Sequence, residues 1–318
     1  MKLPTLEEIE AAGRLVYRHM PPTPQYRWPQ VCEHAGTEVW LKHENHTPVG
    51  AFKIRGGLVY FSQLKKVKGV IAATRGNHGQ SVALCARQSG IAATIVVPHG
   101  NSVEKNAAMR SLGARLIEHG EDFQEAREFA NRLSKEEGLH MVPSFHHLLV
   151  TGVATASLEL FRAVPDLQTL YVPIGLGSGI CGAIAARNAV GSSAEIVGVV
   201  SAHARAYAAS FAARRALDCE VSTLLADGMA CRTPEPEALE LMWQHVERMV
   251  EVTDDEVARA IAILFRCTHN CAEGAGAAPY AAIFKERARL AGRKVAAVLS
   301  GGNIDRDAFA KVLARHES

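Results

Sequence analysis

The sequence predicts an α/β protein with two open, twisted, mostly parallel sheets and helices on both faces of each sheet. Short runs rich in Val, Ile and Ala alternate with helical stretches along almost the whole chain. Such continuous apolar runs are typical of strands buried on both faces of a parallel sheet. The 318 residues exceed the ~100–200 of an average domain. We therefore expect a small lobe, residues 67–145, inserted into a large lobe formed by 1–66 and 146–318.

Each element follows from its local pattern, because β-branched runs predict strands and amphipathic stretches predict helices. The first elements are a strand at Val39–Lys42 and a helix at Phe52–Leu64. In the small lobe, strands are expected at Gly69–Thr74, Ala93–Val97 and Ala114–Ile117, and helices at His78–Gln88, Val103–Leu112 and Asp122–Lys135. In the large lobe, helices are expected at Thr151–Phe161 and Ile180–Ala189, and strands at Leu170–Ile174, Glu195–Val200 and Val295–Leu299. The prolines near Thr233 make Asp218–Pro236 a loop.

Charge and composition exclude several classes of partner. The 35 Lys and Arg nearly balance the 33 Asp and Glu, and no basic run is present, so we expect neither nucleic acid nor a membrane surface as a partner. No apolar run approaches the ~20 residues of a membrane span, and the N-terminus lacks a signal-peptide pattern. The seven cysteines are dispersed and odd in number, which predicts a reducing compartment, the cytoplasm.

A glycine-rich loop follows the predicted strand Leu170–Ile174 and runs into a helix. It contains Gly175, Leu176, Gly177, Ser178 and Gly179. Glycines there let backbone amides approach an anion, and the helix N-terminus adds partial positive charge. The loop therefore predicts a phosphate site, the bland alternative being a tight strand–helix turn kept for packing.

The same loop also matches the dinucleotide fingerprint, so a nicotinamide-dependent dehydrogenase has to be considered. Gly177, Gly179 and Gly182 have the required spacing. The fingerprint also needs an acidic residue at the end of the next strand, ~20 positions on. Glu195 opens that strand instead of ending it. A monophosphate is the better ligand.

Two further polar loops follow predicted strands. Thr74, Arg75, Gly76, Asn77 and His78 come directly after Gly69–Thr74 and enter a helix. Their amide and side-chain donors suit a small anion such as a carboxylate, although an N-cap with polar decoration would look similar. Ser300 and two glycines follow the last strand. Ligands of open α/β sheets bind at the carboxyl ends of strands, so these loops mark the site.

Lys53 lies on the first turn of a predicted helix. The helix macrodipole disfavours a cation there and lowers the pKa of the lysine. Alone, Lys53 would more often be a solvated surface residue. Beside a monophosphate site it suits an amine that forms a Schiff base with pyridoxal phosphate.

Five motifs in order resemble the fold-type II pyridoxal-phosphate enzymes, most closely the group of serine/threonine dehydratases, serine racemases and hydroxyaspartate ammonia-lyases. They cover almost the whole chain: Ala51-Phe-Lys-Ile-Arg-Gly, Gly76-Asn-His-Gly-Gln, the 175–182 loop, Glu273-Gly-Ala-Gly-Ala and Ser300-Gly-Gly-Asn. The resemblance implies a homodimer with a small amino-acid substrate. Because the motifs fill residues 51–303, we expect no appended effector-binding domain.

The resemblance also implies a role for each matching residue. Lys53 would be the Schiff-base lysine and the base at Cα, and Phe52 would pack against the cofactor ring. Asn77 would contact the phenolic oxygen, and Ser300 the pyridine nitrogen. The 175–179 loop would bind the phosphate, and residues 74–78 the substrate carboxylate. A neutral serine at the ring nitrogen makes a weaker electron sink, which favours prompt loss of a β-substituent.

The implied reaction is β-elimination from a β-hydroxy amino acid such as threonine or serine, giving a 2-oxo acid and ammonia. Cofactor-dependent β-replacement fits the loop residues less well, and a dehydrogenase would leave Lys53 and Ser300 without a role. A binding protein without catalysis is the remaining alternative. Racemisation is disfavoured, because racemases of this group place an acid/base at the position of Arg75, and arginine does not readily lose a proton.

Other departures from the group bear on the substrate and on metals. His146 and His147 replace two acids, and Val153 replaces a glutamine, which together with Arg75 predicts a more positive mouth and a bulkier or anionic substrate such as 3-hydroxyaspartate. Surface-loop histidines are an equal alternative. We expect no metal, because the stretch after Glu195–Val200 lacks the usual acids and Cys267 and Cys271 have no second ligand pair.

Overall fold

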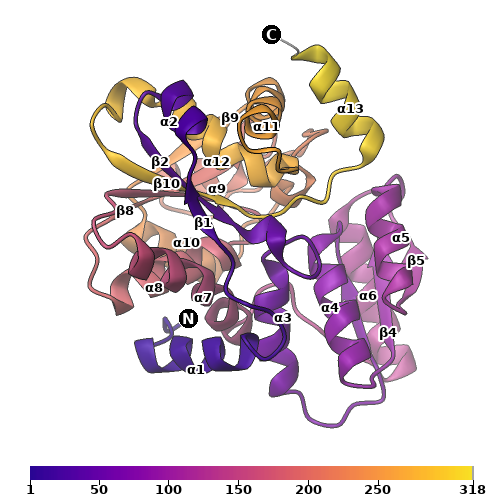
Figure 1. Ribbon diagram of the computed structural model, residues 1–318. Coiled ribbons are helices and arrows are strands. Elements are labelled where there is room, and N and C mark those ends of the chain that lie inside the picture. The colour runs from indigo at the N-terminus through magenta and orange to yellow at the C-terminus, as the bar shows by residue number, and fades with distance from the viewer. Residues whose placement is uncertain (317–318) are drawn as a thin grey trace.

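The computed structural model describes residues 1–316 and folds them into two α/β lobes (Figure 1). The large lobe contains a six-stranded sheet of order β1-β2-β10-β7-β8-β9, and the small lobe a four-stranded sheet of order β5-β4-β3-β6. Within these residues every strand pair is parallel except β1 with β2. The predicted fold class is therefore confirmed.

Helices cover both faces of the large sheet. In β10, Val295, Ala297 and Leu299 pack in one hydrophobic cluster, whereas Ala296 and Val298 pack in another, as the two-residue period of a strand requires. The strands are β1 (Gln25–Arg27), β2 (Glu38–His43), β7 (Thr169–Pro173), β8 (Glu195–Ser201), β9 (Arg248–Val252) and β10 (Lys294–Leu299). The first cluster includes α2 (Pro29–Ala35), α11 (Asp254–Thr268), α12 (Gly274–Lys285) and α13 (Arg306–Arg315); the second includes α1 (Leu6–Val16), α7 (His147–Ala163), α8 (Ser178–Ala189), α9 (Ala206–Ala213) and α10 (Pro236–His245).

The small sheet is covered in the same way. In β3, Val70 and Ala72 share a core with α4 and α5, whereas Ile71 and Ala73 face α6. The strands are β3 (Val70–Ala73), β4 (Ala93–Val97), β5 (Arg115–Glu118) and β6 (His140–Met141). The helices are α4 (Asn77–Gln88), α5 (Val103–Ser111) and α6 (Phe123–Glu137). The whole small lobe lies on the right of Figure 1.

Helix α3 (Lys53–Ser62) lies against both α4 of the small lobe and α7 of the large lobe. Two glycines allow the close approach to α7. A Cβ on Gly56 would lie 2.7 Å from the carbonyl oxygen of Leu149, and one on Gly152 would lie 2.3 Å from that of Arg55. Real Cβ atoms do not come so close, so these positions require glycine.

A buried ionic cluster fixes α3 to β2 and α7. Arg55 of α3 is fully buried and donates from Nε to Glu44 at 2.7 Å and from Nη1 to Glu159 at 2.6 Å. Glu44 is also fully buried, and Lys42 of β2 pairs with Glu159. Two cations and two carboxylates therefore neutralise one another beneath the helix that carries Lys53.

We predict that Glu44→Ala destabilises the protein by about 3–5 kcal/mol, because it leaves the Arg55 guanidinium buried with one carboxylate fewer. Urea unfolding measures the change. Glu251→Ala is the control, since it breaks an exposed pair with Arg205 and should barely move the midpoint. Equal shifts in the two variants would contradict a structural role for the buried cluster.

Candidate functional site

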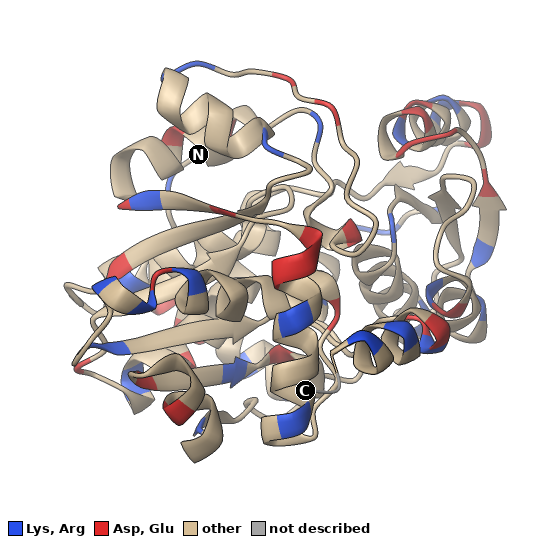
Figure 2. Cartoon of the chain, turned by 90° about the horizontal axis from the view of Figure 1, so that it is seen from above, with Lys and Arg blue, Asp and Glu red and all other residues tan. Residues whose placement is uncertain are grey.

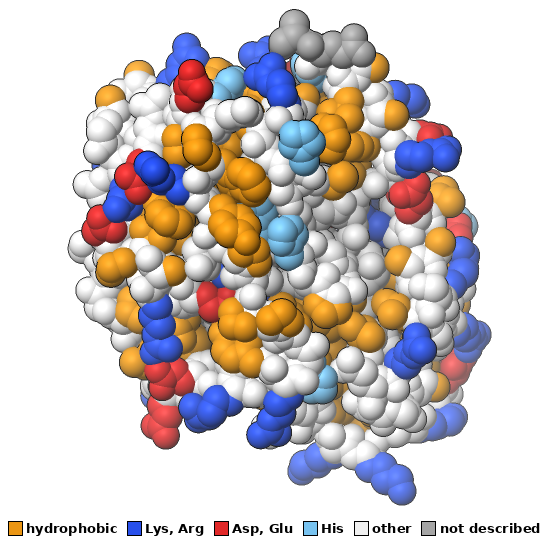
Figure 3. Space-filling view, viewed as in Figure 1, with side chains coloured by type: hydrophobic (Ala, Val, Ile, Leu, Met, Phe, Trp, Pro, Cys, Tyr) orange, Lys and Arg blue, Asp and Glu red, His pale blue; other side chains and the backbone are white. Residues whose placement is uncertain are grey.

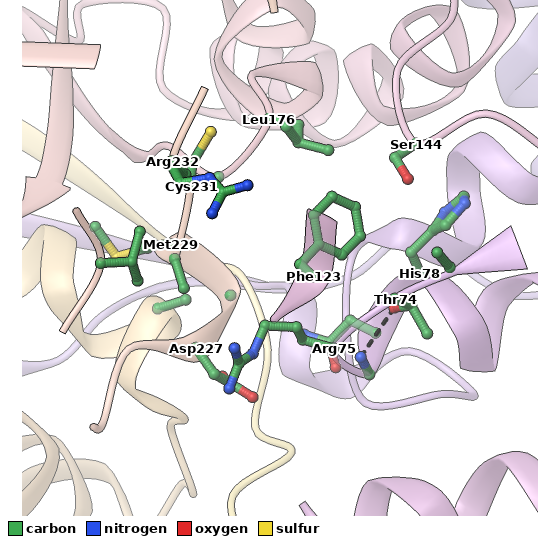
Figure 4. Close-up of a pocket in the computed structure, with 18 of the residues that line it drawn as sticks. Thr74, Arg75, His78, Phe123, Ser144, Leu176, Asp227, Met229, Cys231 and Arg232 are labelled. Carbon is green, nitrogen blue, oxygen red and sulfur yellow. Dashed lines mark hydrogen bonds between the residues drawn. The ribbon is translucent and has the colours of Figure 1, made fainter. Parts of the chain in front are cut away.

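A cavity of about 880 Å³ lies between the two lobes, where the loops after β3, β7 and β10 converge. Figure 4 shows part of its lining, with Thr74, Arg75, His78 and Leu176 among the labelled residues. The structure brings all the predicted site residues into this lining. These are Phe52, Lys53, Thr74, Arg75, Gly76, Asn77, His78, Gly175, Leu176, Gly177, Ser178, Gly179 and Ser300. Residues more than 240 positions apart in the sequence thus share one cavity, because the carboxyl end of β3 in the small sheet and those of β7 and β10 in the large sheet meet there.

Lys53 begins α3, and its Nζ donates to Ser178 Oγ at 2.9 Å. Among the described residues no carboxylate forms an ion pair with it. Burial lowers the pKa of Lys53 to about 8, because desolvation penalises the ammonium form. A useful fraction of the amine is therefore neutral near pH 7, as a nucleophile or base requires.

The glycine loop after β7 forms a cradle beside this amine. Gly177 caps α8 with a φ of 98°, a backbone conformation that favours glycine. A Cβ on Gly175 would lie 2.4 Å from the carbonyl oxygen of Gly228, and one on Gly179 would lie 3.4 Å from the Phe52 ring. The N-terminus of α8 lines the cavity, and the three glycines of the loop have no side chains that would block its backbone amides. This arrangement fits a phosphate group.

Ser300 joins the third loop to Phe52, the residue before Lys53. It follows β10, is buried, and its carbonyl oxygen accepts a hydrogen bond from the Phe52 amide at 3.0 Å. Lys53, the α8 cradle and the Ser300 hydroxyl therefore surround one space with an amine, a phosphate site and a polar side chain. This set fits pyridoxal phosphate, whose aldehyde, phosphate and ring nitrogen need these three partners.

The loop after β3 supplies a second anion site, from the small lobe. Gly76 has a φ of 152°, and Thr74 Oγ1 accepts from the amides of Gly76 and Gly79 at 2.9 and 3.2 Å. Helix α4 starts at Asn77, so its N-terminus faces the cavity. Burial lowers the pKa of His78 to about 3, so this imidazole is neutral. Neutral donors at a helix N-terminus suit a carboxylate.

Three further residues belong to this site, and no role was predicted for them. Glu273 lines the cavity and accepts from Asn77 Nδ2 at 2.5 Å, while Asn303 Nδ2 donates to Asn77 Oδ1 at 2.8 Å. Lys105 of α5 reaches Glu273 and Asp227. Glu273 and Asn303 stand in the motifs of the resemblance, which was the signal for them; no motif marked Lys105.

The prediction of a positive mouth formed with His146 and His147 is wrong. Neither histidine lines the cavity. His146 instead caps α7, accepting from the Leu148 amide at 3.1 Å, and its ring contacts Tyr60. Carboxylates also line the cavity, among them the exposed side chains of Glu121, Glu128, Asp218 and Glu220. Only Arg75 of the three predicted cations contributes there.

Residues 1–316 contain neither a cluster of metal-ligating side chains nor a membrane-spanning helix. No group of three or more His, Cys, Asp or Glu side chains there could hold a metal ion, and His269 lies at the C-cap of α11. No helix in that range is long and apolar enough to span a bilayer. Ribbon segments coloured for Lys and Arg and for Asp and Glu are both spread over the two lobes in Figure 2, and side chains of both signs lie around the rim of the face shown in Figure 3.

Comparison with known proteins agrees with this geometry. A model of the family described as pyridoxal-phosphate dependent enzymes matches residues 16–301. The chain is 37% identical over 305 residues to an L-threonine ammonia-lyase of Thermotoga maritima, covering 95% of this chain and 76% of that protein.

Two solved structures share the fold over nearly the whole chain. The processed form of threonine deaminase isoform 2 from Solanum lycopersicum has a TM-score of 0.90 and 28% identity, covering 97% of this chain and 86% of that one. Maize serine racemase has a TM-score of 0.91 and 25% identity, covering 99% and 98%. The match over 16–301, together with a cavity that fits the cofactor, shows that this chain belongs to the pyridoxal-phosphate dependent enzyme family.

Proposed function

We propose that the protein is a pyridoxal-phosphate dependent lyase that removes the β-hydroxyl and the amino group of L-threonine or L-serine, yielding a 2-oxo acid and ammonia. The observation that carries this proposal is the buried Lys53 amine beside two helix N-termini, in a chain 37% identical to a threonine ammonia-lyase. A homodimeric, cytoplasmic enzyme belongs to the same proposal, and light scattering tests the dimer.

Each side chain then has a defined task. The α8 N-terminus holds the phosphate, and the α4 N-terminus with Thr74 holds the substrate carboxylate. Bound pyridoxal phosphate supplies an electron sink for the negative charge that develops at Cα. Lys53 Nζ takes the Cα proton, which requires the neutral amine that burial favours. Ser178, which accepts from Nζ, holds the amine in the cavity.

A β-hydroxy amino acid with a carboxylate on its side chain is a second candidate substrate, and Arg75 favours it. No hydrogen bond or ion pair joins the Arg75 side chain to the rest of residues 1–316, and its Nε is buried without a partner. In contrast, Lys105 and Arg232 of the same cavity already have carboxylate partners. In Figure 4 the Arg75 side chain extends from the Thr74 loop toward the Asp227–Met229 side of the cavity.

We predict that Lys53→Ala lowers kcat for 2-oxo acid release roughly 10³-fold or more, because the other lysine of the cavity, Lys105, is held as an ammonium by Asp227 and Glu273 and would not replace it as the base. Release from L-threonine and L-serine is measured with a coupled assay. Lys285→Ala, on an exposed helix end, serves as control and should keep full activity. Retention of activity in a folded Lys53→Ala protein would refute the role of this residue.

We predict that covalent uptake of pyridoxal phosphate by cofactor-free protein speeds up about tenfold per pH unit below pH 8 and levels off above it. Only the neutral amine has a free lone pair, and the folded-state pKa of Lys53 is lowered to about 8. Stopped-flow absorbance gives the rates. A midpoint close to 10, the range of an exposed lysine, would contradict the burial of this amine.

We predict that Arg75→Gln lowers kcat/KM for 3-hydroxyaspartate by about 10–150-fold, the effect of a hydrogen bond to a charged group. For L-threonine the change should stay within about threefold, because threonine carries no second carboxylate. The two substrates are compared on both proteins. Equal losses on both, or a wild-type enzyme inactive on 3-hydroxyaspartate, would eliminate the second candidate and leave the first intact.

A further inference from the structure

Lys105 crosses from the small lobe to the large lobe at the edge of the cavity. It lies in the first turn of α5, its side chain is 5% exposed, and its Nζ lies 2.7 Å from Asp227 Oδ2 and 3.2 Å from Glu273 Oε2. Both carboxylates belong to the large lobe. A buried ammonium held between two carboxylates is costly to leave unpaired, so this contact stabilises the packing of the two lobes seen here.

The position of Lys105 is set by a reciprocal cap between two helices. Asp305, the N-cap of α13, accepts from the Ser102 hydroxyl and from the amide of Glu104 in α5. Glu104 in turn accepts from the Arg306 amide, in the first turn of α13, at 3.0 Å. A side chain at the N-terminus of α5 thus accepts from a backbone amide of α13, and one at the N-terminus of α13 accepts from an amide of α5. Lys105 is the next residue along α5.

The lysine stem also depends on Gly76. A Cβ on Gly76 would lie 2.4 Å from Cδ of Lys105, so the stem occupies the space that any other residue would fill. Gly76 is the N-cap of α4 and precedes Asn77. The lysine is therefore packed against the loop that carries the predicted carboxylate site, and not only against its ionic partners.

Glu273 contacts both Lys105 and Asn77 and so connects the two. The Glu273 side chain is 2% exposed, and its Oε1 accepts from Asn77 Nδ2 while Asn303 donates to Asn77 Oδ1. These two bonds define which way the Asn77 amide faces, since a carboxylate can only accept. The second hydrogen on Nδ2 remains for an acceptor in the cavity that Asn77 and Lys53 both line.

We propose that Lys105 is a positioning residue: its ammonium keeps Glu273 a hydrogen-bond acceptor and thereby orients the Asn77 amide donor toward the bound cofactor. The kinetic test of this proposal rests on the proposed function, because it measures 2-oxo acid release. Burial raises the pKa of Glu273 above its usual value, and Lys105 and Asp227 act on it in opposite directions, Lys105 lowering it and Asp227 raising it. Without Lys105, Glu273 would hold its proton to higher pH, and a protonated Glu273 could donate to Asn77 instead.

The test is a double-variant cycle on the holoenzyme with Lys105→Met, Glu273→Gln and both together. The side-chain amide that Glu273→Gln introduces would still offer an acceptor oxygen to Asn77 but would not titrate. We expect Lys105→Met to lower kcat about tenfold or more with KM within about threefold, yet to cost less than about threefold in the Glu273→Gln background. Lys105→Arg should regain most of the activity, and Lys285→Met, at an exposed site, should behave as wild type.

Visible absorbance of the bound cofactor between pH 5 and 9 supplies a readout independent of turnover. Lys105→Met should move to higher pH the Glu273 titration of wild type, because only that variant leaves an ionisable Glu273 without its cation, and the double variant should lack this titration. A purely structural lysine would instead give equal losses in both backgrounds and unchanged pH profiles, which would overturn the proposal.

Glu273→Gln keeps the test decisive if Lys105→Met does not fold. Glu273→Gln combined with Asp305→Ala, which removes the cap, should then lose less kcat than Asp305→Ala alone does against wild type; equal losses would overturn the proposal. If wild type releases no 2-oxo acid, the proposed function fails, while the absorbance profiles still decide the role of Lys105.

Discussion

The chemistry of this protein depends on one constraint: a lysine amine must be kept out of water at the point where three loops from two parallel sheets meet. Lys53 satisfies it at the start of α3, where its amine donates to the Ser178 hydroxyl. Because no carboxylate within residues 1–316 pairs with the amine, burial lowers its pKa to about 8. A surface lysine in the same loop would stay protonated and could not act.

The rest of the structure holds that amine in place. Beneath α3, Arg55 is bound to two carboxylates, and glycines at 56 and 152 bring α7 within backbone contact. The small lobe is held to the large lobe by Lys105 and by the hydrogen bonds between the N-termini of α5 and α13. The same helix therefore serves stability and function, because Arg55 of the buried ionic cluster lies two residues after Lys53.

Sequence patterns predicted the parts that depend on local chemistry. Apolar strands followed by glycine-rich polar loops predicted most strands of both sheets and part of the lining, including Lys53 and Ser300. The edge strand β9 was not predicted, because its Arg and Glu break the apolar run that marks a central strand. Lys105 and its partner Asp227 meet only through the tertiary fold. His146 was misplaced because local sequence does not tell a helix cap from a residue facing a cavity.

Borohydride reduction of the holoenzyme, followed by peptide mapping with mass spectrometry, identifies the lysine that binds the cofactor covalently. We expect a single pyridoxyl adduct on the peptide that contains Lys53. An adduct on Lys105 or another lysine, or a protein that binds the cofactor with nothing reducible, would contradict it.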